Sequence, residues 1–344
     1  ASIAVPGGES LLATSRRGDP RLLQPDLGTP HDDEDPRRGS ADPAVRDDAG
    51  DVHAMDGFCP HMGVDLGIGK VVNNRVRCFF HHWEFDANGQ CQHIPIQQDI
   101  PKKACLRTYA CQEKYGYIWV HPDKNTTTEV LEIPGLAGQP VTVKPGKAYT
   151  RPCHHHITMI NGIDPQHLRT VHDIHIDMDV AIEQAEPRLV EIVLTGQIPD
   201  VTWKERLARK ILGPQYRYAM KYADGCLAGL TLLKDVQFFG RKNGLPELYM
   251  FFAYQTEAPG KTRVQPIFVT RRREGLSGWV ISQLCLLFTR IGFQSLQGED
   301  GQVYENIRFS TQNLLAVDAP VARYIRYINQ LKASCWSLPT PEQP

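Results

Sequence analysis

The stretch that decides the fold of the first part of this chain is Cys59-Pro60-His61, followed by Cys78-Phe79-Phe80-His81. Each motif places one thiol close to one imidazole, and sixteen residues separate the two motifs. The pattern is therefore C-x-H followed by C-x-x-H. Thiolates and imidazoles are the side chains that proteins use to bind iron and zinc.

The residue types favour a Rieske [2Fe-2S] cluster, in which two thiolates hold one iron and two neutral imidazoles hold the other. Such a cluster accepts and passes on single electrons. A zinc knuckle is the alternative, because mixed cysteine and histidine ligation also suits tetrahedral zinc. The usual zinc patterns begin with C-x-x-C or end in H-x-x-x-H, and neither occurs in these motifs. We therefore predict that the cluster ligands are Cys59, His61, Cys78 and His81.

The residues between the two motifs predict a β-hairpin. Val71 to Val76 contains the dipeptide Asn73-Asn74, and asparagine tolerates the positive φ that a tight hairpin turn requires. Glycines follow the first motif, and Asn88-Gly89 follows the second, so both motifs are expected in turns. Such a hairpin would bring the two motifs together.

Composition limits the class of protein. The chain has 344 residues, of which 41% are hydrophobic and 22% charged, enough for two domains. A formal net charge of -1 argues against general binding to nucleic acid or anionic membranes. Nine cysteines without a recognisable signal peptide favour a reducing compartment, and we expect a cytoplasmic protein.

The chain is predicted to have four segments. Residues 1–50 lack aromatic side chains and are rich in charged residues and Pro, so we expect a loosely held segment. Short strands separated by turns predict an all-β cluster domain over residues 51–128. Residues 129–338 should form the second domain, and residues 339–344 a tail.

Residues 129–338 mix strand and helix patterns, which predicts an α+β domain built on one antiparallel sheet. The strands are expected at Leu189–Thr195, Leu227–Phe239, Leu248–Tyr254 and Thr262–Thr270, and the helices at Gly278–Leu296 and Pro320–Lys332. The most apolar run, Trp279–Phe293, is too short and too polar to span a bilayer. We interpret it as a core helix, with a peripheral membrane contact as the alternative.

A second metal site is expected at His167 and His172, within the pattern D-x-x-H-x-x-x-x-H that begins at Asp164. Two imidazoles and one carboxylate form the facial triad of mononuclear non-haem Fe(II) oxygenases. The histidines are five residues apart, so they can bind one iron only if the helix ends or widens between them. Asp164 is expected to accept the second ring N–H of a ligating histidine. Asn161 is placed near the iron.

The third ligand should be a carboxylate far downstream, and Asp300 is the best candidate, with Glu299 and Glu305 as competitors. His154-His155-His156 looks like a metal site as well. Consecutive residues on a strand point to opposite faces, so we expect these three imidazoles not to converge on one metal.

With both motifs in this order, the chain resembles the terminal oxygenase component of the Rieske non-haem iron oxygenases over roughly Asp51 to Trp336. Val171-His172, Gln90–Pro95 and Tyr222–Cys226 are most similar to aminopyrrolnitrin oxygenases, which are arylamine N-oxygenases. The segment D-x-x-V-Y-E-N from Asp300 also resembles the ketosteroid 9-alpha-hydroxylases. In both groups this aspartate is the third iron ligand.

The resemblance implies an N-terminal all-β Rieske domain followed by a helix-grip-like antiparallel-sheet catalytic domain with flanking helices. It implies that a ferredoxin or flavin reductase passes electrons from NAD(P)H to the cluster, and that Fe(II) then activates O2. It also implies a homotrimer, in which Asp164 bridges His81 of one subunit and His167 of the next.

The implied substrate is an aromatic or hydrophobic small molecule. Arylamine N-oxygenation is the first expectation, and hydroxylation of a steroid or another lipophilic ring is the alternative. A Rieske electron carrier is the non-enzymatic alternative, but it needs only the first domain. The chain departs from the family in one respect, since residues 1–50 lack the aromatic-rich strand that usually precedes the first motif.

Overall fold

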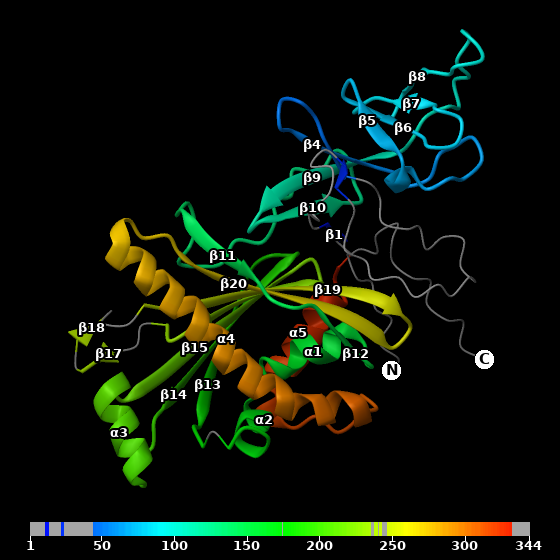
Figure 1. The fold of residues 1–344 in the computed structure, drawn as a ribbon. Coiled ribbons are helices and arrows are strands. Elements are labelled where there is room, and N and C mark those ends of the chain that lie inside the picture. Colours follow the sequence, from blue (N-terminus) through cyan, green and yellow to red (C-terminus); the bar gives the residue numbers. More distant parts are fainter. Residues whose placement is uncertain are drawn as a thin grey trace. The chain divides into compact units, whose positions relative to one another are not determined.

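The computed structural model describes residues 11–13, 22–23, 44–173, 175–234, 237–239, 241–242 and 246–331. These residues form two compact units, one within residues 10–130 and one within residues 131–344 (Figure 1). The domain limits 51–128 and 129–338 remain predictions. The tail at residues 339–344 and most of residues 1–43 lie outside the described residues, so the loosely held segment also remains a prediction.

The described residues of the first unit form two antiparallel sheets and one 3-10 helix, η1 (Leu66–Ile68). The six-stranded sheet has the order β1 (Leu11–Ala13), β10 (Tyr117–His121), β9 (Thr108–Lys114), β4 (Val52–Met55), β3 (Ala44–Arg46) and β2 (Leu22–Leu23). The four-stranded sheet has the order β5 (Lys70–Val72), β6 (Arg75–Arg77), β7 (Glu84–Phe85) and β8 (Cys91–His93). The all-β prediction for this part of the chain is confirmed.

The hairpin predicted between the two motifs is present as β5 and β6. Its two turn residues, Asn73 and Asn74, have φ values of 51° and 60°. Only residues that tolerate the left-handed region fit such a turn, which explains the Asn-Asn sequence. Val71 and Val76 pair across the hairpin and are buried, so the strands cover the small core beside the two motifs.

The second unit is built on an eight-stranded antiparallel sheet. Its strands follow the order β11 (Val141–Pro145), β20 (Lys261–Arg271), β19 (Leu248–Ala258), β16 (Leu227–Leu232), β15 (Gln215–Ala223), β14 (Leu189–Gln197) and β13 (Met178–Glu186), and β12 (Tyr149–Arg151) also pairs with β20. A separate hairpin joins β17 (Gln237–Phe238) and β18 (Arg241–Lys242). The α+β prediction is confirmed.

The helices of this unit are α1 (His155–Asn161), α2 (Pro165–Thr170), α3 (Trp203–Leu212), α4 (Gly275–Asn306) and α5 (Ala319–Ile328), with a short 3-10 helix η2 (Ala316–Asp318) before α5. The long helix α4 crosses the sheet and contacts β12, β19 and β20 (Figure 1). It extends at both ends beyond the predicted range Gly278–Leu296. By length and composition alone, α4 is the one helix among the described residues that is long and apolar enough to span a bilayer. The prediction that this run is too short and too polar to do so is therefore not confirmed.

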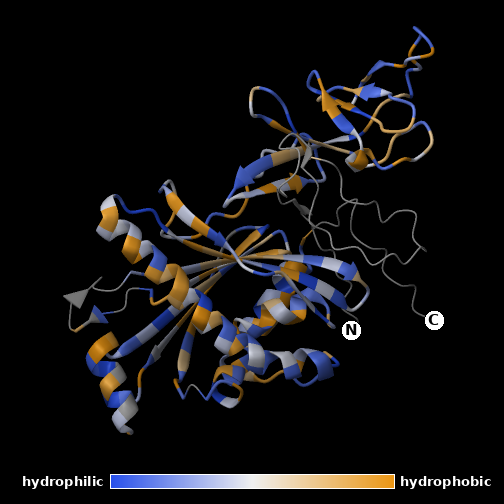
Figure 2. Cartoon of the chain, in the orientation of Figure 1, coloured by the Kyte–Doolittle hydropathy of each residue, from blue (hydrophilic) through white to orange (hydrophobic). Residues whose placement is uncertain are grey.

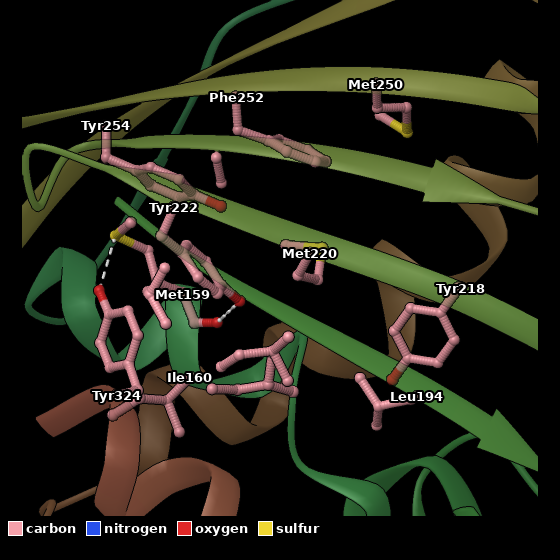
Figure 3. Packing of buried hydrophobic residues seen from close by; sticks show 14 of the residues in the cluster. Met159, Ile160, Leu194, Tyr218, Met220, Tyr222, Met250, Phe252, Tyr254 and Tyr324 are labelled. Carbon is pink, nitrogen blue, oxygen red and sulfur yellow. Dashed lines mark hydrogen bonds between the residues drawn. The ribbon is translucent and has the colours of Figure 1, made fainter. Parts of the chain in front are cut away.

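The core of the second unit lies between one face of the sheet and helices α1, α4 and α5. Tyr222 and Tyr324 are fully buried there, and both reach Met159 on α1 (Figure 3). The Tyr222 hydroxyl donates to the Met159 carbonyl at 2.7 Å, and the Tyr324 hydroxyl contacts the Met159 sulfur at 3.2 Å. These contacts fix α1, and hence the segment that follows it, against the sheet.

The expected strand Leu227–Phe239 is wrong in its second half. Strand β16 ends at Leu232, and Leu233 has a φ of 56°, which no β-strand accommodates. Phe238 and Phe239 lie in the separate β17–β18 hairpin, where Phe239 is 60% exposed. The apolar residues at the two ends of the expected strand therefore belong to two separate elements.

Candidate metal centres

The first candidate centre is formed by two loops with matching hydrogen bonds. The Cys59 N–H donates to the Val64 carbonyl and the Cys78 N–H to the Trp83 carbonyl, both at 2.9 Å. Each loop therefore closes on itself just after its histidine. Both cysteines are buried, at 4% and 1% exposure. The buried core of the unit lies directly behind them.

The two histidines lie at the surface of the same unit. The Nδ1 atoms of His61 and His81 are 3.1 Å apart, so both nitrogens can bind one iron ion. The indole ring of Trp83 stacks on His61, with 4.6 Å between centroids and 8° between ring planes. Trp83 therefore fixes the orientation of that imidazole, a role that the sequence did not indicate.

The donor set fits a [2Fe-2S] cluster. Burial, together with the neighbouring Cys78, raises the pKa of the Cys59 thiol to about 11. A thiolate pair is therefore unfavourable here unless a cation neutralises it, as bound iron does. Two inner thiols and two outer imidazoles match the division of ligands between the two irons of a Rieske centre.

The second candidate centre begins on α2, which the Asp164 side chain caps by accepting the Gln166 N–H at 2.8 Å. The helix ends at Thr170, between the two histidines. The His167 carbonyl accepts the N–H of Val171 at 2.8 Å and that of His172 at 3.4 Å. This widened last turn turns His172 back toward His167, and their ring centroids are 4.9 Å apart.

Asp300 on α4 completes the group. Its Oδ1 lies 3.1 Å from Nε2 of His172 and 3.9 Å from Nε2 of His167. That oxygen is buried and has no hydrogen-bond partner. A buried, unpartnered carboxylate oxygen is costly, and a cation among the three side chains would satisfy it. The three ligand atoms lie within 4.8 Å of one another, so the geometry fits a mononuclear Fe(II) ion.

Both imidazoles are held from behind. Nδ1 of His167 donates to the main-chain carbonyl of Asp164 at 2.8 Å, and Nδ1 of His172 donates to the Glu299 carboxylate at 2.6 Å. With Nδ1 protonated, each Nε2 presents a lone pair toward Asp300. Burial lowers the pKa of His167, which favours the neutral form that binds metal.

Two expectations for these residues are corrected. The Asp164 carboxylate does not accept a ring N–H from either histidine, because it caps α2 and leaves that contact to its own carbonyl. Glu299 was considered only as a rival ligand, yet it orients His172. Glu305 is exposed on the next turn of α4. The carbonyl of Asn161, at the end of α1, accepts the Asp164 N–H at 3.4 Å, and its placement near the iron remains a prediction.

The three consecutive histidines do converge, contrary to expectation. His154 caps α1 while His155 and His156 begin it, so the strand argument does not apply. Their ligand atoms lie within 4.8 Å of one another. Nδ1 of His154, however, accepts the His156 N–H, which places the ring proton on its Nε2 and leaves no lone pair there for a metal.

The comparisons with known proteins agree with this architecture. Residues 37–110 match the model of the Rieske [2Fe-2S] domain. Protein TIC 55, chloroplastic, of Arabidopsis thaliana is 28% identical over 303 residues, which cover 83% of this chain and 54% of that protein. The oxygenase component of 3-ketosteroid-9-alpha-monooxygenase of Rhodococcus rhodochrous is 35% identical over 94 residues, 27% of this chain and 24% of that protein.

Aminopyrrolnitrin oxygenase PrnD of Pseudomonas fluorescens is 38% identical over 84 residues, 22% of this chain and 23% of that protein. The chain thus spans about half or less of the length of these relatives. Two of the solved structures that match share the fold over most of the chain. NdmA of Pseudomonas putida CBB5, as a mutant with caffeine, has a TM-score of 0.64 at 16% identity, covering 93% of this chain and 89% of NdmA. Dicamba monooxygenase bound to dicamba has a TM-score of 0.59 at 19% identity, covering 84% and 90%.

Proposed function

We propose that this chain, which belongs to the Rieske non-haem iron oxygenases by its cluster domain and its fold, oxygenates an aromatic or lipophilic small molecule. In this proposal the electrons come from NAD(P)H through a ferredoxin or flavin reductase, and O2 is the co-substrate. One observation carries the proposal: the buried, unpartnered Oδ1 of Asp300 faces Nε2 of His167 and of His172. An electron carrier has no use for that second centre.

When bound, an iron ion at these three side chains supplies open coordination positions at which oxygen can be activated. The protein holds both imidazoles in the tautomer that leaves Nε2 unprotonated, through the Asp164 carbonyl and the Glu299 carboxylate. The His172 side chain is only 2% exposed, so the surrounding residues exclude bulk water from its ring. Dry surroundings protect reactive species from side reactions.

The cluster domain is suited to electron exchange with partners. His61 and His81 are exposed, and three large apolar side chains beside them are also exposed: Met62, Phe79 and Phe80. Exposed apolar side chains around a redox group favour docking of another protein surface. We assign this surface to a reductase partner and to the neighbouring subunit of a homotrimer, in which Asp164 bridges His81 and His167.

For the substrate, we propose an arylamine that is oxidised at nitrogen, with ring or C–H hydroxylation of a steroid as the second candidate. The similarity to PrnD supports the first, and that to the 3-ketosteroid-9-alpha-monooxygenases supports the second. Apolar side chains predominate in the core of the second unit (Figure 3), and Leu168, next to His167, packs against that core. Such surroundings favour a lipophilic substrate. We place the reaction in the cytoplasm, where free thiols stay reduced.

Two measurements test the proposed function. NAD(P)H-coupled oxygen uptake with a surrogate reductase should depend on an arylamine or a steroid, and mass spectrometry should find a product gaining one oxygen atom. Asp164→Asn should abolish this uptake while both iron sites stay occupied, whereas Asp177→Asn, at a carboxylate 99% exposed, should behave as the unmodified protein. If the reductase reduces the cluster but no substrate increases the oxygen uptake, the chain is an electron carrier.

A further inference from the structure

The long helix α4 packs its small and polar side chains, and not its large apolar ones, against the sheet. Its buried residues in the first five turns are mostly small or polar, namely Gly278, Ser282, Cys285, Leu286 and Thr289. The large apolar side chains point away from the sheet and are exposed: Leu276, Val280, Ile281, Leu284, Leu287, Phe288 and Ile291. The expectation of a core helix over Trp279–Phe293 is therefore wrong for this face.

These exposed side chains form one continuous stripe. Leu276, Val280, Leu284, Leu287 and Ile291 follow the i, i+4, i+8, i+11, i+15 spacing, which places them on one side of an α-helix. Each is at least 41% exposed, and Leu276 reaches 80%. An apolar patch of this length on a protein surface marks an interaction site.

The charged residues near the stripe are mostly basic, although Glu274, which precedes the first residue of α4, is also exposed. Arg271 and Arg272 precede the helix and are exposed, as is Arg290 beside the stripe. No acidic residue lies between Gly275 and Gly298. Trp279, 58% exposed, lies on the Arg290 flank of the helix. Arginines and a tryptophan beside an apolar stripe suit an anionic lipid surface, where the charges meet headgroups and the indole lies at their level.

A second helix of the same unit repeats this pattern independently. On α3, Trp203 is 66% and Leu207 is 48% exposed, four residues apart on one face, while Arg206 and Lys210 are exposed beside them. Basic amphipathic helices of this kind bind membrane surfaces. In Figure 1, α3 and the beginning of α4 lie on the same side of the catalytic unit, and Figure 2 shows apolar residues along both helices.

We propose that the exposed faces of α4 and α3 bind the surface of a bilayer that contains anionic phospholipid. Since α4 packs against β12, β19 and β20 on its other side, it lies in the interface and does not cross it. This inference does not depend on the reaction catalysed. The net charge of -1 argued against binding to anionic membranes. The proposal differs because the charged residues around the stripe are mostly basic although the whole chain is nearly neutral.

The test is co-sedimentation of the full chain, with its metal centres loaded, with vesicles of phosphatidylcholine alone or with added phosphatidylglycerol. We expect stronger binding to the anionic vesicles, reduced by salt. Leu284→Glu with Leu287→Glu should weaken binding by at least about tenfold. Ile68→Glu with Ile96→Glu places two equal charges at exposed residues of the other unit and should leave binding unchanged.

Circular dichroism and cluster absorbance show whether each variant folds. If the α4 variant does not, Arg272→Glu with Arg290→Glu, which alters only exposed charges, should remove the preference for anionic vesicles. The proposal is overturned if the unmodified chain ignores both kinds of vesicle or if a folded α4 variant still binds them. It is also overturned if that variant lowers the molar mass of the protein in solution, since a second copy of the chain then covers the stripe.

Discussion

The two candidate metal centres of this chain are assembled in opposite ways. The cluster ligands come from two short loops on either side of one hairpin, with thiols buried and imidazoles exposed. In the mononuclear centre, His172 and Glu299 meet from positions 127 residues apart, and the His172 side chain is 2% exposed. A centre that exchanges electrons needs an open edge, whereas a centre that handles oxygen needs a closed one.

The largest effect is expected from a substitution that disrupts only the mononuclear centre, whose ligands are far apart in the sequence. Asp300→Ala removes one ligand and should lower turnover by at least about 100-fold, more than the loss of an outer hydrogen-bond partner causes. The cluster absorbance should stay unchanged, because no cluster ligand is touched. Iron analysis should show one iron fewer per chain, and Glu305→Ala on the next turn is the control. Normal turnover in Asp300→Ala would exclude this aspartate as a ligand.

The reverse experiment breaks the local centre. Cys59→Ala removes a buried thiol and should abolish the visible absorbance of the [2Fe-2S] cluster, while the mononuclear iron remains. Turnover driven by a reductase should then cease. Cys285→Ala, at another buried thiol of the chain, tests whether the loss is specific to the cluster. Equal loss of absorbance in both variants would contradict the assignment.

A smaller change sharpens the contrast in how the ligands are held. Glu299→Gln replaces the acceptor of the His172 N–H with an amide of the same shape, which removes the negative charge behind the ring. We expect iron affinity at the mononuclear centre to fall about 10- to 100-fold. Iron titration monitored by substrate-dependent oxygen uptake measures this. An affinity equal to that of Glu305→Gln would show that the Glu299 contact does not support the metal.

The smallest effect is expected at the cluster site, where the indole of Trp83 stacks on His61. Trp83→Leu removes the ring that stacks on His61. The free energy of unfolding should fall by about 0.5 to 1.5 kcal/mol in addition to the effect of the lost apolar contact. The cluster absorbance should disappear at a lower temperature on heating. Trp119→Leu alters a buried indole of the other sheet of the same unit and should destabilise the fold without a specific effect on the cluster.

The same contrast explains what the sequence could predict. The cluster motifs and the Asn73-Asn74 turn are local, so spacing alone indicated both the centre and the hairpin. The pair His167 and His172 was visible as a pattern, but its partner on α4 was chosen among three carboxylates by resemblance. Glu299 contacts Nδ1 of His172 and Asp300 faces Nε2 of the same ring. Which carboxylate takes which role depends on how α4 lies across the sheet, and no local sequence pattern encodes that.

Other differences have similar causes. The end of β16 at Leu232 was missed because apolar residues also follow the turn with positive φ at Leu233. The orientation of α4 was predicted wrongly because the large apolar side of a helix normally faces the core, whereas here the small and polar residues Gly278 and Ser282 lie on the buried side.

Asp164 serves two structures with two different groups. Its carboxylate begins α2, and its carbonyl holds the imidazole of His167. A partner that draws the carboxylate away from the Gln166 N–H would loosen the first turn of α2. The Asp164 carbonyl would then move as well and release the ring of His167. We therefore expect the arrival of an electron donor and the readiness of the oxygen site to be mechanically coupled through a single residue.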